Sequence, residues 1–518
     1  MQGLGVSRAV VVLALSAAAC GPTAQPIDVV ESTIARIQES ISDGRTTCRM
    51  VVQTYLDRIE VYDESTVNAI TVVNPNALAR ADEIDAAVAA GEELGPLFCV
   101  PMLVKDNFDT HDLPTTGGSI ALMGSLPPDD AFMVRRIREA DAVVIAKTNM
   151  AEWAFSPRQT VSSSYDTTAN AYDLERVPAG SSGGTASGVA ASFAVAGLGS
   201  DTGNSIRGPA SHLALVGIRS TIGLTSRDGV IPLSFDRDIA GPIARTVIDA
   251  AKIFNVVAGY DPADPYTEAG RGRKEADYTE GLEPNALQGA RIGVLRSLVD
   301  GEDTDTAVAR VFEQAVADLV RLGAEIVDPF DFDVQEQLRR SGMFCGRFRY
   351  DMHVYLQSLG DAAPIKDVME VLETGEYSPY VERSLRRSAN SPLDVHPADA
   401  DPPCHDYLEN EGRQAYLSDL VTAMDQARVD AIVYPTWRNP PAHIDRAREE
   451  YKGDNSQLVA PATGMPAITV PMGFTYGNLP AGLQILARPY DELLLFKYAY
   501  AYEQGTHHRK PPEGFPAL

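Results

Sequence analysis

Two serine-bearing glycine loops contain the residue types from which a nucleophilic site could be built. The first spans residues 180–184 (GSSGG) and the second spans residues 201–205 (DTGNS). A serine after a glycine-rich turn can attack a carbonyl carbon while nearby backbone N–H groups stabilise the oxyanion. The backbone N–H groups that could do so in the second loop belong to Thr202, Gly203, Asn204 and Ser205.

A nucleophilic serine also needs a base, and Lys105 is the candidate. It ends an apolar run over residues 101–104 (PMLV), where the end of a strand would place it against the core. Burial lowers the pKa of a lysine, and a neutral amine can accept a proton. The alternative is a lysine that pairs with Asp106 at the end of the strand, and the spacing does not decide between the two.

Residues 180–184 also match the GxSxG pattern of an α/β-hydrolase nucleophile elbow, with Ser182 at the centre. An elbow follows a strand directly, but residues 177–180 (VPAG) would form a poor strand. An elbow also needs an acid and then a histidine later in the chain, and nothing singles out such a pair. The elbow is therefore the weaker interpretation of Ser182.

Strand and helix patterns alternate along the chain, which is typical of an α/β fold. Residues 27–92 have the apolar spacing of helices, and the pattern then changes to strands over 98–108 and 141–150, with a helix over 133–140 between them. Nothing marks a second independent core, so one large domain is expected. Further predicted elements are strands over 291–295, 324–330, 430–436 and 466–472, a helix over 305–323, and surface loops over 260–290 and 390–406.

The first twenty residues have the pattern of an export signal. Arg8 precedes an apolar run over residues 9–19, which is too short for a stop-transfer helix and suits a signal-peptide core. The small residues before Cys20 resemble a bacterial lipobox, although alanine replaces the usual leucine three residues before the cysteine. We therefore predict a signal peptide over 1–20, a tether over 21–26, and export to the periplasm or to a membrane through a lipidated Cys20.

Charge and cysteine content limit the classes of partner. The 518 residues include 44 Lys and Arg against 71 Asp and Glu, a formal net charge of −27 at pH 7. Phosphate contacts need clustered Lys and Arg, so this balance argues against a nucleic-acid partner. The five cysteines include no CxxC pair and HExxH is absent, so no metal centre is suggested. In an exported chain Cys345 and Cys404 could pair, but the sequence alone does not pair them.

Residues 180–211 (GSSGGTASGVAASFAVAGLGSDTGNSIRGPAS) resemble the defining signature of the amidase signature family. Residues 95–119 resemble the lysine segment of that family, and residues 216–247 and 464–492 are similar to its later blocks. The resemblance covers most of the chain. It is weak over about 255–425, which is expected where members of the family differ in substrate.

The resemblance implies one domain over residues 27–518, in which helices cover both faces of a mixed, twisted β-sheet. It implies a triad in which Ser205 is the nucleophile, Ser181 follows a cis peptide bond, and Lys105 is the general base. The backbone N–H groups of residues 202–205 would form the oxyanion hole. No metal and no organic cofactor is implied. The residues expected to support the two loops are Ser182 and a pair formed by Asp201 and Arg207.

One position departs from the pattern of the family. A second glycine usually precedes the nucleophile, where this chain has Asn204. Asparagine tolerates positive φ better than most residues, so we expect the turn to survive with Asn204 in that conformation. We expect the side chain of Asn204 to affect substrate preference more than activity.

Five aromatic residues are candidates for the lining of a substrate pocket. Aromatic side chains in a chain of this composition are more often part of the core, so each is a weak candidate. They are Trp153, Phe155, Phe344, Tyr350 and Trp437.

Together these features predict hydrolysis of an amide-type C–N bond in a small or medium substrate, through a Ser205 acyl-enzyme. Aryl amides, carbamates and esters are within reach of the same site. Two alternatives stay open: a catalytically silent binding lipoprotein on the same fold, and the glutaminase subunit of a tRNA-dependent amidotransferase. The intact triad speaks against the first, and the export signal and acidic balance speak against the second. The expected partner is a small molecule and not a nucleic acid.

Overall fold

The computed structural model describes residues 24–341 and 345–518. The predicted signal peptide, with Cys20, and the first half of the predicted tether lie outside the described residues. Gln25, near the end of that tether, donates its backbone N–H to the carbonyl of Arg45 at 2.9 Å, so the chain contacts the fold from this residue onward. No helix among the described residues is both long and apolar enough to cross a bilayer.

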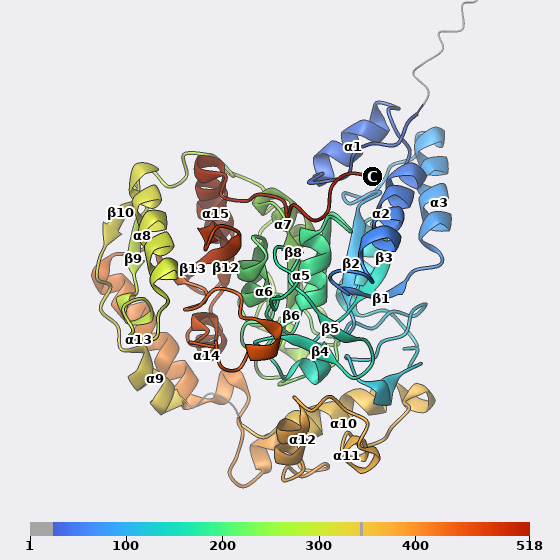
Figure 1. Cartoon of the computed structure of the whole chain (residues 1–518). Coiled ribbons are helices and arrows are strands. Elements are labelled where there is room, and N and C mark those ends of the chain that lie inside the picture. The colour runs from blue at the N-terminus through green and yellow to red at the C-terminus, as the bar shows by residue number, and fades with distance from the viewer. Residues whose placement is uncertain (1–23, 342–344) are drawn as a thin grey trace, which may run out of the picture.

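The described residues form one large mixed sheet of eleven strands (Figure 1). Its strands are β1 (Ile70–Val73), β2 (Pro101–Lys105), β3 (Val143–Thr148), β6 (Ala196–Asp201), β7 (Val216–Arg219), β8 (Ile239–Ala244), β9 (Arg291–Val294), β10 (Glu325–Val327), β11 (Ala431–Pro435), β12 (Ala467–Thr475) and β13 (Leu479–Ala487). The spatial order is β1-β3-β2-β6-β8-β7-β12-β13-β11-β9-β10. β2 is parallel to β3 and β6, and β9 is parallel to β10 and β11, whereas the other neighbours are antiparallel. A separate short pair is formed by β4 (Thr160–Ser162) and β5 (Asp166–Thr168).

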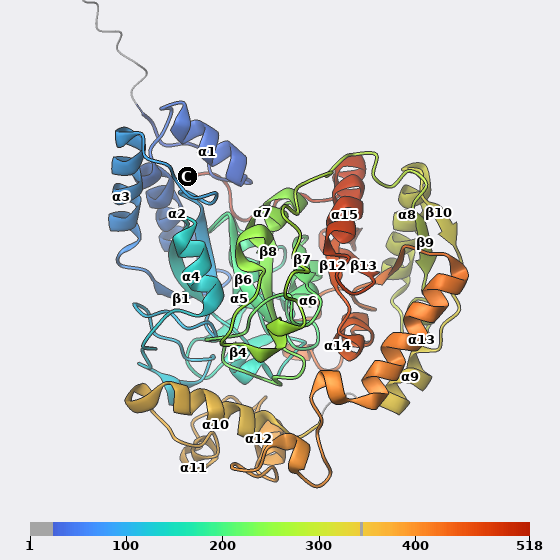
Figure 2. The same ribbon diagram turned by 180° about the vertical axis from the view of Figure 1, so that it is seen from behind.

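Helices cover both faces of the sheet, which confirms the expected α/β fold (Figures 1 and 2). They are α1 (Ile34–Ser42), α2 (Cys48–Tyr62), α3 (Ala77–Ala90), α4 (Phe132–Glu139), α5 (Gly183–Ala190), α6 (Arg207–His212), α7 (Val247–Val257), α8 (Thr306–Arg321), α9 (Val334–Ser341), α13 (Glu411–Ala427), α14 (Ala460–Thr463) and α15 (Glu492–Thr506). α5 and α6 lie in front of the sheet in Figure 1, and α4 and α7 lie in front of it in Figure 2. α15 contacts α7 and α8, which extends the second layer along the sheet.

The central strands are buried along their whole length, which explains why they appear in the sequence as continuous apolar runs. Every residue of β2, β3 and β11 is buried, as is usual for strands covered by helices on both faces. The strands predicted over 98–108, 141–150, 291–295, 324–330, 430–436 and 466–472 and the helices predicted over 133–140 and 305–323 are confirmed.

The prediction that residues 27–92 form helices is wrong in two places. Residues 27–33 are not helical: the Asp28 carboxylate accepts from the N–H of Val30 at 2.9 Å, and α1 begins only after Thr33, whose hydroxyl caps the N–H of Arg36. The short segment 70–73 is strand β1, because it completes the edge of the sheet against β3. That pairing is a long-range contact, which apolar spacing does not report.

Residues 345–404, called the cap below, lie outside the sheet at the bottom of Figure 1. The cap contains α10 (Phe348–Ser358), α11 (Glu370–Thr374) and α12 (Glu382–Ser388). Its Phe348 ring packs against Phe155 and Trp153, with ring centroids 4.6 and 6.3 Å apart. The weakly matching region over 255–425 is therefore not one structural unit, because it supplies both the cap and the strands β9 and β10 of the sheet.

Two disulfides join distant parts of the chain. Cys345 and Cys404 are bonded at the two ends of the cap, the pair that the sequence left undecided. The second bond joins Cys48 at the start of α2 to Cys99, just before β2, and sequence reasoning missed it. Only the fold brings these two cysteines together, since 51 residues separate them.

We expect the Cys48–Cys99 bond to stabilise the helical N-terminal segment against the sheet. A disulfide across 51 residues restricts the unfolded chain, so the Cys48→Ala/Cys99→Ala variant should lose about 2–4 kcal/mol of unfolding free energy. Urea denaturation followed by circular dichroism measures this loss. Reduction of the unmodified protein should shift its transition in the same direction, and coincident urea midpoints for variant and oxidised protein would contradict the expectation.

Candidate active site

Lys105 lies at the centre of the predicted site and contacts the first glycine loop. Its side chain is fully buried, and its Nζ is 2.7 Å from Ser181 Oγ and 2.8 Å from Ser200 Oγ. β2 and β6 are parallel neighbours, so Lys105 and Ser200 stand at the carboxyl ends of adjacent strands. The fold thereby brings together groups 76 and 95 residues apart in the chain.

Burial lowers the pKa of Lys105 to about 7, although the negative charges of Asp201 and Asp238 oppose that shift. The alternative pairing with Asp106 is wrong. Successive side chains of a strand point to opposite faces, and the Asp106 carboxylate instead faces Lys147, 3.6 Å away, and accepts a hydrogen bond from the Thr116 hydroxyl. A substantial fraction of Lys105 is therefore neutral near pH 7.

Sequence reasoning missed two residues that hold the lysine. Ser200 accepts from Lys105 Nζ, and it also accepts from Asn107 Nδ2 at 2.9 Å. The Asn107 amide in turn reaches the carbonyl of Ile231 at 3.4 Å. Ser200 directly precedes Asp201, and Asn107 follows Lys105 by two residues. Only the parallel pairing of β2 and β6 shows that Ser200 and Asn107 meet.

The first glycine loop packs too closely for side chains at its glycines. The Gly180–Ser181 peptide bond is cis, as the resemblance implies for Ser181. A β-carbon at Gly180 would lie 2.5 Å from the carbonyl oxygen of Ser156, and one at Gly183 would lie 2.1 Å from Thr160 Oγ1. Glycine is therefore required here by close approach of the neighbouring loop.

Ser182 links the two loops and does not sit on an elbow. Its Oγ donates to the carbonyl of Ser200 at 3.2 Å, and residues 177–180 before it are not a strand. Its hydroxyl is fully buried. The nucleophile-elbow interpretation of Ser182 is therefore wrong, because the strand-to-helix turn that would expose its hydroxyl does not form.

Ser205 lies in the second loop, just before α6, and is 4 % exposed. Its hydroxyl donates to Asn204 Oδ1 at 3.4 Å, and Asn204 Nδ2 donates to the carbonyl of Pro157 at 3.2 Å. The Ser205 hydroxyl is thus directed at Asn204 and not at Ser181. Asn204 does not have positive φ, so that expectation is wrong: the turn runs through ordinary backbone, and the asparagine acts through its side chain.

The backbone of the second loop presents unpaired donors. Among the described residues, the N–H groups of residues 202–205 donate no hydrogen bond. The next two N–H groups, of Ile206 and Arg207, both donate to Asp201 Oδ2. This pattern of free N–H groups beside a serine is the geometry required of an oxyanion hole.

A buried ion-pair network fixes that loop. The Asp201 carboxylate lies 3.1 Å from Arg207 Nε and 3.0 Å from Arg219 Nη1, and all three side chains are fully buried. Burial by itself raises the pKa of Asp201, but the two guanidinium groups outweigh it and lower the pKa to about 2. The expected Asp201–Arg207 pair is confirmed, and Arg219 is a third member that the sequence did not indicate. Thr202 Oγ1 donates to Asp238 and extends the network.

A cavity of about 280 Å³ lies between the cap and the core residues Phe155, Leu233 and Ser234. Phe155 is the only one of the five aromatic candidates that lines it; Phe344 lies outside the described residues. Trp153 is core, Tyr350 packs against His396, and Trp437 packs against His212.

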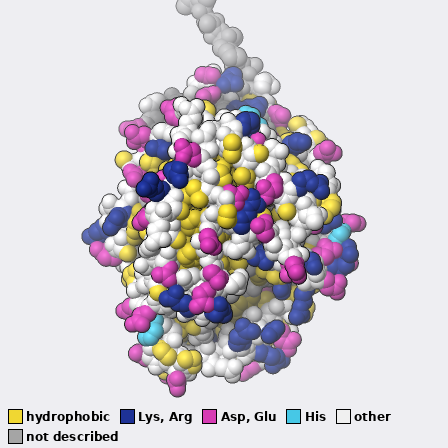
Figure 3. Space-filling model, turned by 90° about the vertical axis from the view of Figure 1, so that its left-hand side faces the viewer, with side chains coloured by type: hydrophobic (Ala, Val, Ile, Leu, Met, Phe, Trp, Pro, Cys, Tyr) yellow, Lys and Arg dark blue, Asp and Glu magenta, His cyan; other side chains and the backbone are white. Residues whose placement is uncertain are grey.

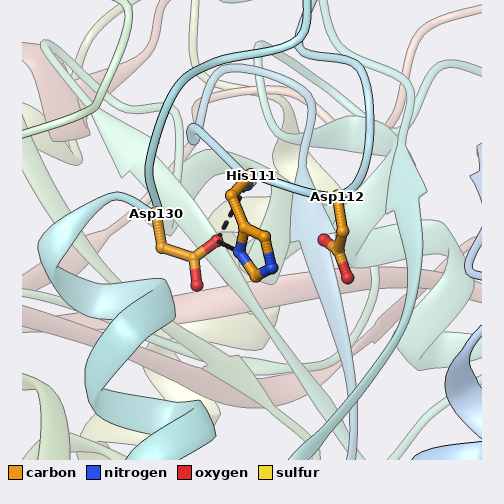
Figure 4. Close-up of side chains that lie close together, drawn as sticks. All are labelled: His111, Asp112 and Asp130. Atoms are coloured by element: carbon orange, nitrogen blue, oxygen red, sulfur yellow. Dashed lines mark hydrogen bonds and ion pairs between the residues drawn. The ribbon is translucent and has the colours of Figure 1, made fainter.

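The described residues also contain one cluster with metal-ligand chemistry, away from the two loops. It consists of His111, Asp112 and Asp130 (Figure 4). The Arg138 guanidinium makes ion pairs with both carboxylates, at 2.6 Å from Asp112 and 3.2 Å from Asp130, and His111 Nδ1 is 2.9 Å from Asp130. Because the arginine already neutralises these acids, the cluster is an ion-pair network, and we assign it no metal.

Comparison with known proteins identifies the relatives of this chain. The amidase family model matches residues 50–496. A glutamyl-tRNA(Gln) amidotransferase subunit of Gloeothece citriformis is 34 % identical, covering 92 % of this chain and 98 % of the relative.

Solved structures give a second comparison. Native peptide amidase from Stenotrophomonas maltophilia has a TM-score of 0.82 and 33 % identity, covering 93 % of this chain and 98 % of that one. The corresponding glutamyl-tRNA(Gln) amidotransferase subunit of Thermotoga maritima has a TM-score of 0.71 and 27 % identity, covering 96 % and 99 %. With the family model spanning most of the sequence and both structures sharing the fold, this chain belongs to the amidase family, whose members act on amide C–N bonds.

Proposed function

We propose that this chain hydrolyses an amide bond through an acyl-enzyme on Ser205, with Lys105 and Ser181 as the proton relay. The observation that carries the proposal is the 2.7 Å hydrogen bond between a fully buried lysine amine and Ser181 Oγ, beside a loop of free N–H groups. A buried amine with a pKa near 7 is matched to general-base work at neutral pH.

The relay begins at the lysine. Neutral Lys105 takes a proton from Ser181, and Ser181 takes one from Ser205 once the Ser205 hydroxyl turns away from Asn204. Ser205 Oγ attacks the carbonyl carbon, and the free N–H groups of residues 202–205 stabilise the oxyanion. The proton returns through Ser181 to the leaving nitrogen, and water then releases the acyl group by the same route. Ser182, Asp201 and Arg207 hold the two loops in place.

The substrate class is the finer part of this proposal. A small or medium amide is the first candidate, with aryl amides, carbamates and esters open to the same nucleophile. The high structural similarity to a peptide amidase supports a single-chain hydrolase. The Asn204 side chain, which fills space next to Ser205, is expected to restrict the group that can sit there.

The glutaminase subunit of an amidotransferase is the second candidate, and the identity to curated glutamyl-tRNA(Gln) amidotransferase subunits favours it. Glutamine is itself a small amide, so the same relay would serve. On the face drawn in Figure 3, Lys and Arg side chains are interspersed with Asp and Glu, without the continuous basic patch that binds tRNA phosphates. Glutaminase activity that charged tRNA stimulates would favour the amidotransferase subunit. Amide hydrolysis by the isolated chain that is unaffected by charged tRNA would favour the single-chain hydrolase.

We also propose that the chain acts outside the cytoplasm. The signal-like sequence over 1–20 supports export, and two disulfides suit an oxidising compartment. Lipidation at Cys20 would anchor the protein to a membrane. Mass spectrometry of the protein from its host would locate the mature N-terminus and any acyl chains on Cys20.

A fluorophosphonate probe should label Ser205. Peptide mapping should place the adduct on that residue, and the Ser205→Ala variant should lose labelling together with at least about 10⁴-fold of amide turnover. The matched control is Ser182→Ala, which removes the neighbouring loop serine and should keep its label. An adduct on Ser182, or full turnover by Ser205→Ala, would contradict the proposal.

The Lys105→Ala variant should lose amide hydrolysis more severely than ester hydrolysis. Expulsion of an amine needs the returned proton, whereas an alkoxide or phenoxide leaves without it, so we expect about 10²–10⁴-fold loss on an anilide and less on its matched ester. Steady-state kinetics on the two substrates measure the difference. Equal losses on both would rule out the relay.

The rate should also fall in acid. With the pKa of Lys105 near 7, protonation below that pH removes the base, so kcat/KM should decrease about tenfold per pH unit below about 6 and level off above about 8. A pH profile on an uncharged anilide tests this. A flat profile down to about pH 5 would show that Lys105 is not the base.

A further inference from the structure

A cavity between the cap and the core is lined by none of the residues of the relay. Core residues Phe155, Leu233 and Ser234 form one wall, and cap residues Phe348, Ser384 and Arg387 belong to the other. Its volume of about 280 Å³ suits part of a small molecule. The cap is the part of the chain expected to vary with substrate, so its contribution to this cavity bears on specificity.

The walls of the cavity are joined to the catalytic loops by hydrogen bonds. The Asp238 carboxylate accepts from the N–H groups of Leu233 and Ser234, at 2.9 and 3.0 Å, and it also accepts from Thr202 Oγ1 of the second glycine loop. On the other side, Phe155 is followed by Ser156, whose carbonyl packs against Gly180. Residues of the cavity wall are therefore linked to both loops through Asp238 and Ser156, although neither loop lines the cavity itself.

The charge of the cavity is opposite to that of the protein. The chain has 71 acidic residues and a net charge of −27, yet no Asp or Glu among the described residues lines this cavity. Two arginines do. Arg347 is already committed, because its guanidinium pairs with Asp351 at 2.7 Å and with Asp406 at 2.8 Å.

Arg387 is the second arginine that lines the cavity. Within the described part of the chain, its guanidinium has no ion pair and no hydrogen bond. The adjacent Arg386 on the same helix instead pairs with Glu382, at 2.8 Å. Arg387 is exposed to solvent as well as lining the cavity. An unpaired guanidinium beside serine hydroxyls and two aromatic rings is suited to bind a carboxylate through two parallel N–H···O bonds.

We infer that this cavity is a carboxylate subsite, and that the enzyme prefers amides whose acyl or amine part carries a carboxylate, bound by Arg387. Phe155 and Phe348 would pack against the short apolar chain between the carboxylate and the scissile bond. This inference rests on the proposed function, because it names the substrate class of the same site.

Matched anilides test the inference. Succinyl-4-nitroanilide and butyryl-4-nitroanilide have acyl chains of equal length and differ in the carboxylate, and a second pair carries the carboxylate on the amine ring. We expect kcat/KM to be at least about tenfold higher for the anionic member of one pair. Arg387→Ala should lose about 10–100-fold on that member and stay within about twofold on the neutral one.

Arg386→Ala is the control, since it removes the same charge from the same helix outside the cavity. Equal effects of the two substitutions, equal losses on neutral and anionic substrates, or no preference in the unmodified enzyme would each overturn the subsite. Binding of succinyl-4-nitroanilide to Ser205→Ala, measured by calorimetry with and without Arg387→Ala, gives a readout free of chemistry. About tenfold weaker binding in the double variant supports the subsite even if turnover fails, whereas unchanged binding overturns it.

Discussion

The burial of one lysine amine is the constraint on which the rest of this site depends. Lys105 stands at the end of a strand covered on both faces, and its only hydrogen-bond acceptors among the described residues are the hydroxyls of Ser181 and Ser200. Among the described residues, no carboxylate pairs with the Lys105 amine. The cost of its desolvation is therefore not fully offset, and its pKa falls toward 7. An ion pair at this position would keep the amine protonated and remove its ability to act as a base.

Burial leaves Lys105 partly neutral, but the equally buried Asp201 stays ionised. Arg207 and Arg219 lie within ion-pair distance and keep it ionised. Removal of one partner from a buried pair is costly, by about 3–5 kcal/mol, so the loop of residues 201–207 is held rigidly. The free N–H groups of residues 202–205 keep a fixed orientation because the side chains of Asp201, Arg207 and Arg219 hold the loop. Oxyanion stabilisation needs donors that are preorganised in this way.

The cap completes the site without belonging to the sheet. Two hydrogen bonds dock it on the core: Tyr355 donates to Asp109 at 2.7 Å, and Asp351 accepts from the N–H of Phe235 at 2.9 Å. The Cys345–Cys404 bond ties its two ends together. The sheet therefore positions the candidate reacting groups, while the cap, closed by its own disulfide, supplies one wall of the cavity.

The sequence by itself predicted the candidate reacting groups and most of the buried strands. The two glycine loops, the lysine after an apolar run and the pairing of Asp201 with Arg207 involve residues close together in the chain, so short segments indicated them. The roles of Lys105, Ser181 and Ser205 came from the resemblance to the amidase signature family. The tertiary structure decided what depends on long-range contact: Ser200 and Asn107 beside the lysine, Arg219 beside Asp201, the Cys48–Cys99 bond and strand β1. It also decided the backbone of Asn204 and the unpaired state of Arg387, since φ at a turn and the partners of a side chain follow from how distant segments pack.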